Sequence, residues 1–155
     1  MGTPERRGVS AAEFAQLAEF RYQIRRFVRF SESVARAAGL EPRQHQLLLA
    51  LKGFGRGKRP SVGELAERLQ ILHHSAVGLV DRLERRGLVV RSREDEDRRL
   101  VSVALTARGE TLIDELSRHH LAELRQAGPA LVEVLASLSS GTGRRAARRR
   151  RKAAT

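Results

Sequence analysis

The sequence predicts a mostly α-helical chain with one small β-hairpin, an α+β class. Over most of the 155 residues, apolar side chains recur at alternating steps of three and four, which is the pattern of amphipathic helices. Residues 100–105 differ, because apolar and small side chains alternate there as they do in a half-buried strand. The length of the chain and its 41% of hydrophobic residues suit a single domain with a genuine core.

A capping box from Ser10 to Glu13 predicts the start of a long first helix, and Gly39 is placed to end it. Along this helix runs a mostly apolar seam, formed by Leu17, Phe20, Ile24, Phe27, Ser31, Val34 and Ala38. The spacing of the seam suits packing along a partner helix, as in a dimer. An intramolecular core stripe would have the same spacing, so both explanations remain open.

The middle of the chain predicts three shorter helices. Pro42 suits the first position of the second helix, whose buried face consists of Leu47, Leu48 and Leu51. A second capping box, Ser61 to Glu64, begins a short third helix. After a break at residues 70–72, a fourth helix runs to Gly87 and buries Ala76, Val80 and Leu83. The third and fourth helices are therefore joined by a tight turn.

A β-hairpin follows, with strands at residues 88–90 and 100–105. Its charged loop, residues 94–99, has no apolar side chain to bury and is expected to project from the body. Thr106 is a suitable N-cap for a long fifth helix, and Pro129 is placed to open a sixth.

These elements predict one domain over residues 10–138. Its core, at about residues 42–105, lies between long terminal helices at about 10–38 and 106–138. Residues 139–155 contain nothing to fold around, and we expect them to form a basic, disordered tail.

The chain is strongly basic, with 30 Lys and Arg against 18 Asp and Glu and a formal net charge of +12. Seven of these cations lie in residues 144–152, so the rest of the chain keeps a net charge of +5. Such an excess favours a polyanionic partner, and the tail lacks the large apolar residues of a membrane anchor. No apolar run could span a membrane, no signal peptide is recognisable, and the absence of cysteine excludes thiolate metal sites. We expect a cytoplasmic, nucleoid-associated protein without a membrane partner.

Helix, short turn, helix and two-stranded ribbon is the order of a winged helix-turn-helix, whose second helix enters the major groove of duplex DNA. We expect the start of that helix, His73, His74 and Ser75, to meet base edges. Val77 could contact a thymine methyl group, and Gly78 would allow close approach. Phosphate contacts are expected from the C-terminal half of the helix, at Arg82, Arg85 and Arg86.

Several segments together resemble the MarR family of bacterial transcription regulators: Leu65 to Leu69, His74 to Leu83, Arg86 to Leu88, Asp97 to Arg99 and Leu105 to Gly109. The resemblance covers about residues 14–138. It implies a homodimer, held together by its first, fifth and sixth helices, on a pseudo-palindromic operator. It places Arg98 in the minor groove and Arg99 on the backbone, with Asp97 orienting one of these guanidinium groups. In many members, a small aromatic or phenolic effector releases the DNA.

Other polar and aromatic residues have competing interpretations. Tyr22, Phe27 and His45, with Phe20, could line an effector cleft, although core packing is the default for the phenylalanines. His120 lies on an apolar stripe and is interpreted as a core histidine. Metal binding by His73 and His74, or by Glu115, His119 and Glu123, is not favoured, and we expect no cofactor.

The sequence therefore predicts a sequence-specific DNA-binding transcriptional regulator, with repression as the family habit. The alternative is a nonspecific architectural DNA-binding protein that uses the same surfaces for phosphates alone. An enzyme is not expected, because the chain shows no nucleophile paired with a base and no phosphate-binding glycine motif.

Overall fold

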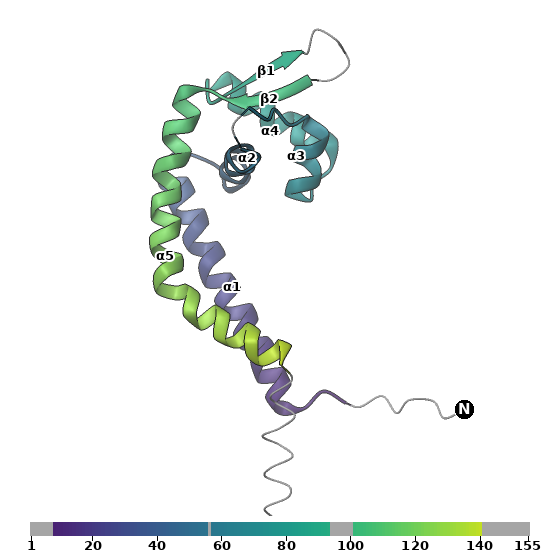
Figure 1. Ribbon diagram of the computed structural model, residues 1–155, viewed down its shortest axis with the longest axis vertical. Coiled ribbons are helices and arrows are strands. Elements are labelled where there is room, and N and C mark those ends of the chain that lie inside the picture. Colours follow the sequence, from purple (N-terminus) through teal and green to yellow (C-terminus); the bar gives the residue numbers. More distant parts are fainter. Residues whose placement is uncertain (1–7, 56, 94–100, 141–155) are drawn as a thin grey trace, which may run out of the picture. The chain divides into compact units, whose positions relative to one another are not determined.

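The computed structural model describes residues 8–55, 57–93 and 101–140. Within these ranges the chain forms helices α1 (Ala11–Ala37), α2 (Pro42–Gly53), α3 (Val62–Leu69), α4 (His73–Arg85) and α5 (Ala107–Ser139), and strands β1 (Val89–Arg93) and β2 (Val101–Leu105) (Figure 1). The two strands pair antiparallel, from Val89 opposite Leu105 to Arg93 opposite Val101. The predicted mostly helical α+β class with one hairpin is confirmed.

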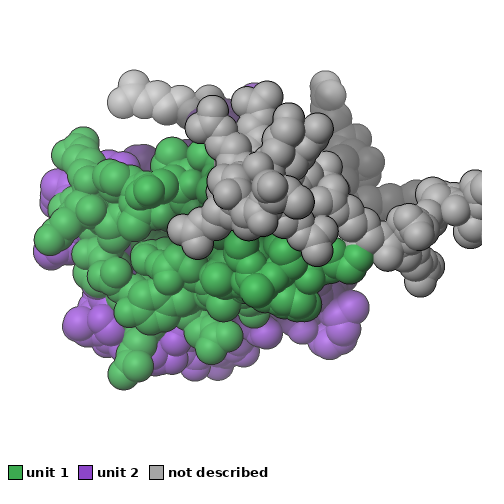
Figure 2. All heavy atoms as spheres, turned by 90° about the horizontal axis from the view of Figure 1, so that it is seen from below, with its two compact units in different colours: residues 1–30, 122–155 green, residues 31–121 purple. Residues whose placement is uncertain are grey.

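The chain divides into two compact units, which are coloured separately in Figure 2. One unit comprises residues 31–121 and contains α2, α3, α4, the hairpin, the end of α1 and the start of α5. The other comprises residues 1–30 and 122–155. The predicted DNA-binding residues of α4 all belong to the unit of residues 31–121.

The core of residues 31–121 is formed mainly by leucine and valine side chains of α2, α3, α4 and the hairpin, with Ala35 from the end of α1 and Ile113 from the start of α5. Its largest fully buried members are Leu40, Leu47, Leu48, Leu65, Leu83, Leu88, Ile113, Val80, Val89 and Val103. The buried faces predicted for α2 and α4 are confirmed, since their six predicted residues are all buried. Val34 and Ala38 pack against this core, so the C-terminal end of the seam on α1 is intramolecular. Leu17, at its other end, is 45% exposed.

Side-chain caps fix the helix starts that the sequence predicted. Ser10 and Glu13 close a capping box, in which the Glu13 amide donates to Ser10 Oγ at 3.2 Å and the Ser10 amide donates to Glu13 Oε2 at 2.8 Å. Thr106 Oγ1 accepts from the Gly109 amide at 3.1 Å and thereby caps α5. These bonds satisfy amides that have no partner within their own helix.

The prediction of a separate sixth helix beginning at Pro129 is wrong. Pro129 lies inside α5, which continues without a break to Ser139. A proline in a helix removes one hydrogen bond, to the carbonyl four residues earlier, and causes a local steric conflict. The surrounding residues 126–136 include three alanines and keep an apolar spacing at Leu131 and Val134, so the helix continues in spite of this local loss.

No helix in the described ranges is both long and apolar enough to cross a membrane.

Candidate nucleic-acid interface

A tight turn orients α4 relative to α3. The capping box at Ser61 and Glu64 sets the start of α3, with bonds of 2.8 Å and 3.2 Å between the backbone of each residue and the side chain of the other. The Ser61 backbone and side chain donate to the Glu64 carboxylate and lower its pKa. At the other end, Gln70 takes the left-handed conformation at φ 53°, and its side-chain Nε2 donates to the Glu67 carbonyl at 2.8 Å. This side-chain bond supports a conformation that usually favours glycine.

The predicted base-reading residues do not all share one side of α4. At about 100° per residue, His74, Gly78, Arg82 and Arg85 lie on the face opposite the buried core residues. Ser75 is at one flank of this outward face. His73 and Val77 are at the other flank, where Val77 is half-buried and packs against the core.

The outward face of α4 borders a groove of about 780 Å³. Its walls come from α4, the start of α2 and the end of α1, and include His74, Ser75, Gly78, Arg82, Arg43 and Arg36. A Cβ atom placed at Gly78 would lie 3.5 Å from Arg82 Nη1, an ordinary van der Waals distance, so the position of this guanidinium does not itself require a glycine. Glu32 and Glu41 also line the groove, and Glu32 pairs with Arg36 at 3.2 Å, so Arg43 and Arg82 are the arginines of the groove without a carboxylate partner among the described residues.

Arg91 of β1 neutralises the two acidic residues of α4. Its Nη2 donates to Asp81 Oδ1 at 2.5 Å, and its Nη1 donates to Glu84 Oε2 at 2.8 Å. The Arg91 amide also donates to Glu84 Oε1 at 3.0 Å. Burial alone would lower the pKa of Arg91, but the hydrogen bonds and charges of the two carboxylates outweigh it and raise the pKa. The hairpin is thus joined to α4 through side chains and backbone together.

The three predicted phosphate-binding arginines of α4 differ in their surroundings. Arg82 and Arg85 are exposed, and Arg85 Nε donates to the Asp81 carbonyl at 3.3 Å. Arg86 is half-buried, and its Nη1 donates to the Gly39 carbonyl at 2.8 Å and to the side chain of Gln44 at 3.2 Å. Arg86 therefore ties the end of α4 to the turn between α1 and α2, which the sequence did not predict.

The first turn of α4 has no side-chain cap. Leu72 stands at the N-cap position with no side-chain hydrogen bond and is 67% exposed. The Ser75 amide donates to the Leu72 carbonyl at 3.0 Å, so it is the His73 and His74 amides that depend on water or on an external acceptor, and a helix N-terminus of this kind favours anions.

Comparison with known proteins identifies this region. A sequence model described as "MarR family" matches residues 38–100. Residues 38–100 are a MarR-family domain. They contain α2, α3, α4 and the first strand of the hairpin, the elements whose geometry is described above.

Curated relatives of the MarR domain are described as transcriptional regulators. The chain is 33% identical over 78 residues to the HTH-type transcriptional repressor MdtR of Bacillus subtilis, and the match covers 50% of this chain and 48% of that protein. It is 39% identical over 72 residues to the HTH-type transcriptional regulator FarR of Neisseria gonorrhoeae, covering 46% and 47% of the two chains. The chain thus spans about half the length of the curated relatives that it matches.

Solved structures match over most of the chain. AbsC, a MarR-family transcriptional regulator from Streptomyces coelicolor, has a TM-score of 0.72 and 23% identity, covering 93% of this chain and 98% of that one. CouR, a transcriptional repressor bound to a DNA duplex, has a TM-score of 0.62 and 28% identity over 86% and 99%. NadR, in complex with 4-hydroxyphenylacetate, has a TM-score of 0.58 and 25% identity over 92% and 97%. These likenesses confirm the predicted fold.

The hairpin of the MarR domain is braced near the loop end of its strands, partly by a residue of the segment before α3. Ser92 Oγ and Ser102 Oγ are 2.8 Å apart across the strands, and Arg59 Nη1 donates to Ser92 Oγ at 3.0 Å. The predicted wing residues Asp97, Arg98 and Arg99 lie outside the described residues. Their roles remain predictions.

Gly109 explains the close contact between α5 and the MarR domain. A Cβ atom at this position would lie 2.1 Å from the Leu88 carbonyl oxygen, which also accepts from the Thr106 amide at 3.1 Å. Only glycine permits this approach. Gly109 lies in the segment from Leu105 to Gly109, one of those that resemble the MarR family, but the sequence did not indicate its contact with Leu88.

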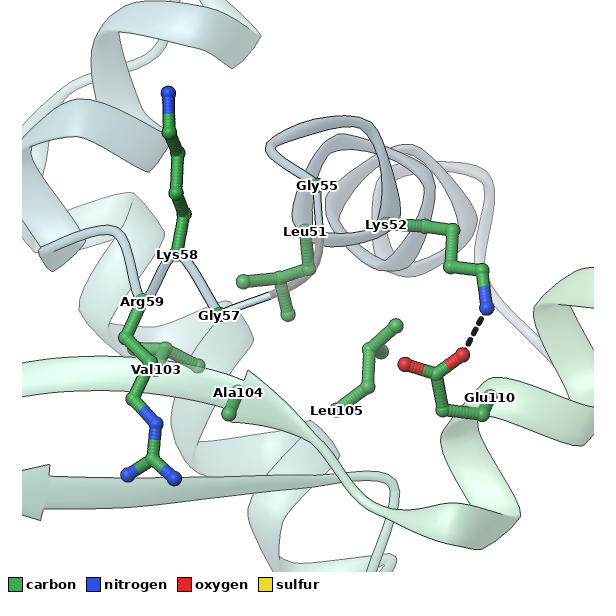
Figure 3. Close-up of a pocket in the computed structure, with 10 residues that line it drawn as sticks. All are labelled: Leu51, Lys52, Gly55, Gly57, Lys58, Arg59, Val103, Ala104, Leu105 and Glu110. Atoms are coloured by element: carbon green, nitrogen blue, oxygen red, sulfur yellow. Dashed lines mark hydrogen bonds and ion pairs between the residues drawn. The ribbon is translucent and has the colours of Figure 1, made fainter.

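A second cavity, of about 480 Å³, lies between the end of α2, strand β2 and the start of α5 (Figure 3). Leu51 and Leu105 point into it, whereas Lys58 and Arg59 extend away from it in different directions. Lys52 closes one end by pairing with Glu110 and with Asp114 at 3.3 Å. The hydrogen bond to Glu110 is the main cause of a raised pKa at Lys52.

The residues predicted to line an effector cleft lie in different parts of the chain. Tyr22 is 55% exposed on α1, with the guanidinium carbon of Arg26 5.9 Å from its ring centroid. Phe27 belongs with Tyr22 to the unit of residues 1–30 and 122–155, whereas His45 belongs to the other unit. A shared cleft remains a prediction.

His45 and His120 form a buried stack, with their ring centroids 4.6 Å apart. His120 Nδ1 lies 2.7 Å from the Leu116 carbonyl and its Nε2 lies 2.8 Å from Ser31 Oγ, so its interpretation as a hydrogen-bonded core histidine is confirmed. His45 Nε2 is buried and has no hydrogen-bond partner among the described residues. Burial, followed by repulsion from His120, lowers the pKa of His45 to about 4.

The part of the chain that the structure describes contains no group of three or more His, Asp or Glu side chains arranged to hold a metal ion, at residues 115–123 or elsewhere.

Proposed function

We propose that this chain is a transcriptional regulator that binds a specific sequence of duplex DNA through α4 and the hairpin. The observation that carries the proposal is the outward face of α4, where His74, Gly78, Arg82 and Arg85 lie together in a MarR-family domain. Asp81 and Glu84, the acidic residues of this helix, are paired with Arg91. The unpaired charges left on α4 are therefore cationic, which suits the major groove and its phosphates.

Base selection would come from His74 and Ser75 and from the flanking residues His73 and Val77, with Gly78 allowing close approach. Arg82 and Arg85 would bind phosphates beside the groove, and Arg86 would do so only through donors that its internal bonds leave free. In the hairpin loop, Arg98 would enter the minor groove and Arg99 would contact the backbone, with Asp97 orienting one of these two guanidinium groups.

The proposed assembly is a homodimer on a pseudo-palindromic operator. Several large apolar side chains of residues 1–30 and 122–155 are exposed, which supports an interface between two copies: Phe14, Leu17, Val28, Leu124, Val132 and Leu135. Two copies must hold their α4 helices about 34 Å apart to enter successive major grooves. A chain that sediments as a monomer at micromolar concentration would contradict this assembly.

Repression is the proposed outcome of binding, because MdtR and CouR are described as repressors. A small aromatic or phenolic acid is the proposed effector class, supported by NadR with its 4-hydroxyphenylacetate. Such a ligand would release DNA by changing the distance between the two α4 helices.

The test is selection of duplexes from a random pool by the full chain, followed by competition. A regulator should prefer the selected operator to random duplex by roughly 10³-fold or more, whereas a nonspecific architectural protein should show no such preference. Replacing Arg82 and Arg85 by Ala should weaken binding to both kinds of duplex, because phosphate contacts are lost. Arg98→Ala tests the wing in the same assay, and an unchanged affinity would remove Arg98 from the proposal.

A further inference from the structure

Leu72 is an exposed apolar side chain at the start of α4. It occupies the N-cap position of this helix and is 67% exposed. None of the large hydrophobic side chains that the structure describes is more exposed. The preceding residue, Ile71, is half-buried and packs against the core of residues 31–121, so the turn before α4 directs one apolar side chain inward and leaves the next one in solvent.

A leucine at this position gives the free chain no stability that another residue would not give. A serine, threonine, aspartate or asparagine at the N-cap accepts a hydrogen bond from an amide of the first turn, and leucine cannot. An exposed leucine also buries little apolar surface in return. The gain from Leu72 must therefore come from a contact that the free chain does not make.

The N-cap position places Leu72 at the tip of α4. A side chain at the N-cap lies over the end of the helix, which is why cap residues can reach the amides of the first turn. In a helix-turn-helix, the N-terminal residues of the second helix meet the base edges. Val77, for which the sequence predicted an apolar base contact, is half-buried and packs against the core. Leu72 is the more exposed of the two, and it lies closer to the tip of the helix.

The apolar group that base edges present in the major groove is the C5-methyl group of thymine. Leucine has no hydrogen-bond donor or acceptor, so it can select a base only through such a group. Thymine also presents its O4 acceptor in the same groove, and the amides of His73 and His74 have no acceptor among the described residues. Cytosine has a donor instead of O4 and lacks the methyl group. An apolar side chain beside free N–H groups therefore suits thymine.

We propose that Leu72 is a specificity-determining residue, which packs against the C5-methyl group of a thymine in each half of the operator. The proposal rests on the proposed function, because α4 must enter the major groove for Leu72 to reach a base. It adds that the operator has a thymine where each half-site faces the tip of α4.

The experiment uses the full chain and the operator selected from the random pool. Each thymine of the operator is replaced in turn by uracil, which lacks only the methyl group. At one thymine of each half-site, this replacement should weaken binding of the unchanged chain about 4-fold, the effect of losing one buried carbon. Leu72→Ser should bind the thymine and uracil duplexes equally, whereas Leu72→Met, which keeps an apolar side chain, should keep most of the difference.

The variants separate recognition from stability. Leu72→Ser supplies the missing cap, so urea denaturation should find it at least as stable as the unchanged chain, although it no longer distinguishes thymine from uracil. Leu72→Ala serves in its place if Leu72→Ser unfolds more readily. Leu49→Ala, which shortens another exposed leucine, on α2, is the matched control and should keep the 4-fold difference.

Two results would overturn the role of Leu72 and leave the proposed function intact. One is an operator in which no thymine responds to uracil, and the other is a 4-fold difference that persists in Leu72→Ser. Equal weakening of Leu72→Ser on operator and random duplex, with the uracil difference retained, would likewise show a general effect on binding. A chain that selects no operator from the pool would overturn the proposed function and the role of Leu72 together.

Discussion

Replacing Arg91 by Met should weaken DNA binding although Arg91 lies behind the proposed contact face. Met keeps most of the aliphatic stem and removes the guanidinium that joins β1 to Asp81 and Glu84. The substitution leaves two carboxylates of α4 without their cation and loosens the hairpin from the helix. Both effects act against a surface that must present cations and a fixed wing to one duplex.

The magnitude follows from how exposed the three side chains are. Arg91 is 25% exposed, and Asp81 and Glu84 are 46% and 37% exposed, so solvent screens both ion pairs. Each pair should contribute about 0.5–1 kcal/mol, or about 1–2 kcal/mol together. If these ion pairs hold the hairpin in the arrangement that binds DNA, they stabilise that arrangement by at most about 1–2 kcal/mol. Losing them can therefore lower the binding free energy by no more than that amount. The dissociation constant for the operator should therefore rise about 5- to 30-fold.

The assay is fluorescence anisotropy with the selected operator, accompanied by urea denaturation of the free protein. Arg118→Met, which removes an exposed cation from α5, is the matched control and should change the affinity by less. Adding Asp81→Asn and Glu84→Gln to Arg91→Met should restore the part of the loss that comes from unpaired negative charge, whereas the part due to the loosened hairpin should persist. If Arg91→Met lowers stability as expected but binds the operator like the unchanged chain, Arg91 does not position the wing.

Three further predictions concern stability. Gly109→Ala should destabilise the fold by about 3 kcal/mol, because the added Cβ would lie 2.1 Å from the Leu88 carbonyl oxygen. A Cβ added at Gly128 would have no atom within 4 Å, so Gly128→Ala should stabilise α5 by about 0.5–1 kcal/mol. Urea denaturation measures both, and equal effects would contradict the steric argument. Leu72→Ser should supply the missing cap of α4 and raise the unfolding free energy by about 1 kcal/mol, a gain that thermal or urea unfolding would reveal or refute. The pKa of His45 is lowered from 6.5 to about 4 in the folded chain, so as the pH falls His45 takes up a proton in the unfolded chain before it does so in the folded chain. The unfolding free energy should therefore be highest above pH 6.5 and decrease by up to about 3 kcal/mol as the pH falls to 4. His45→Phe should flatten this decline, and an unchanged pH profile would show that another group causes it.

The starts of the helices could be predicted because their signals are local. Ser10 with Glu13, and Ser61 with Glu64, are three residues apart and meet within one turn. The continuation of α5 through Pro129 could not be predicted in this way. A proline weakens a helix at one position, and the sequence alone does not show how far packing on either side compensates.

The contacts that shape the candidate site are mostly between distant segments, which explains why the sequence did not reveal them. Arg86 bonds to Gly39 and Gln44, more than forty residues away in the chain. Gly109 is required by a carbonyl at Leu88, on a different element. A local pattern can place such residues on a helix or strand, but the partner becomes known only when the elements are packed.

Among these contacts between distant segments, the one that matters most for the proposed function is the one that changes the charge of α4. Counted along the helix, Arg82 and Arg85 cancel Asp81 and Glu84, so α4 has no net charge with its histidines neutral. A neutral helix would have no electrostatic attraction to DNA. The structure resolves the contradiction, because Arg91 approaches from β1 and takes both carboxylates. The hairpin therefore contributes to the proposed interface even without its loop, by leaving the two exposed arginines of α4 as the unpaired charges of that helix.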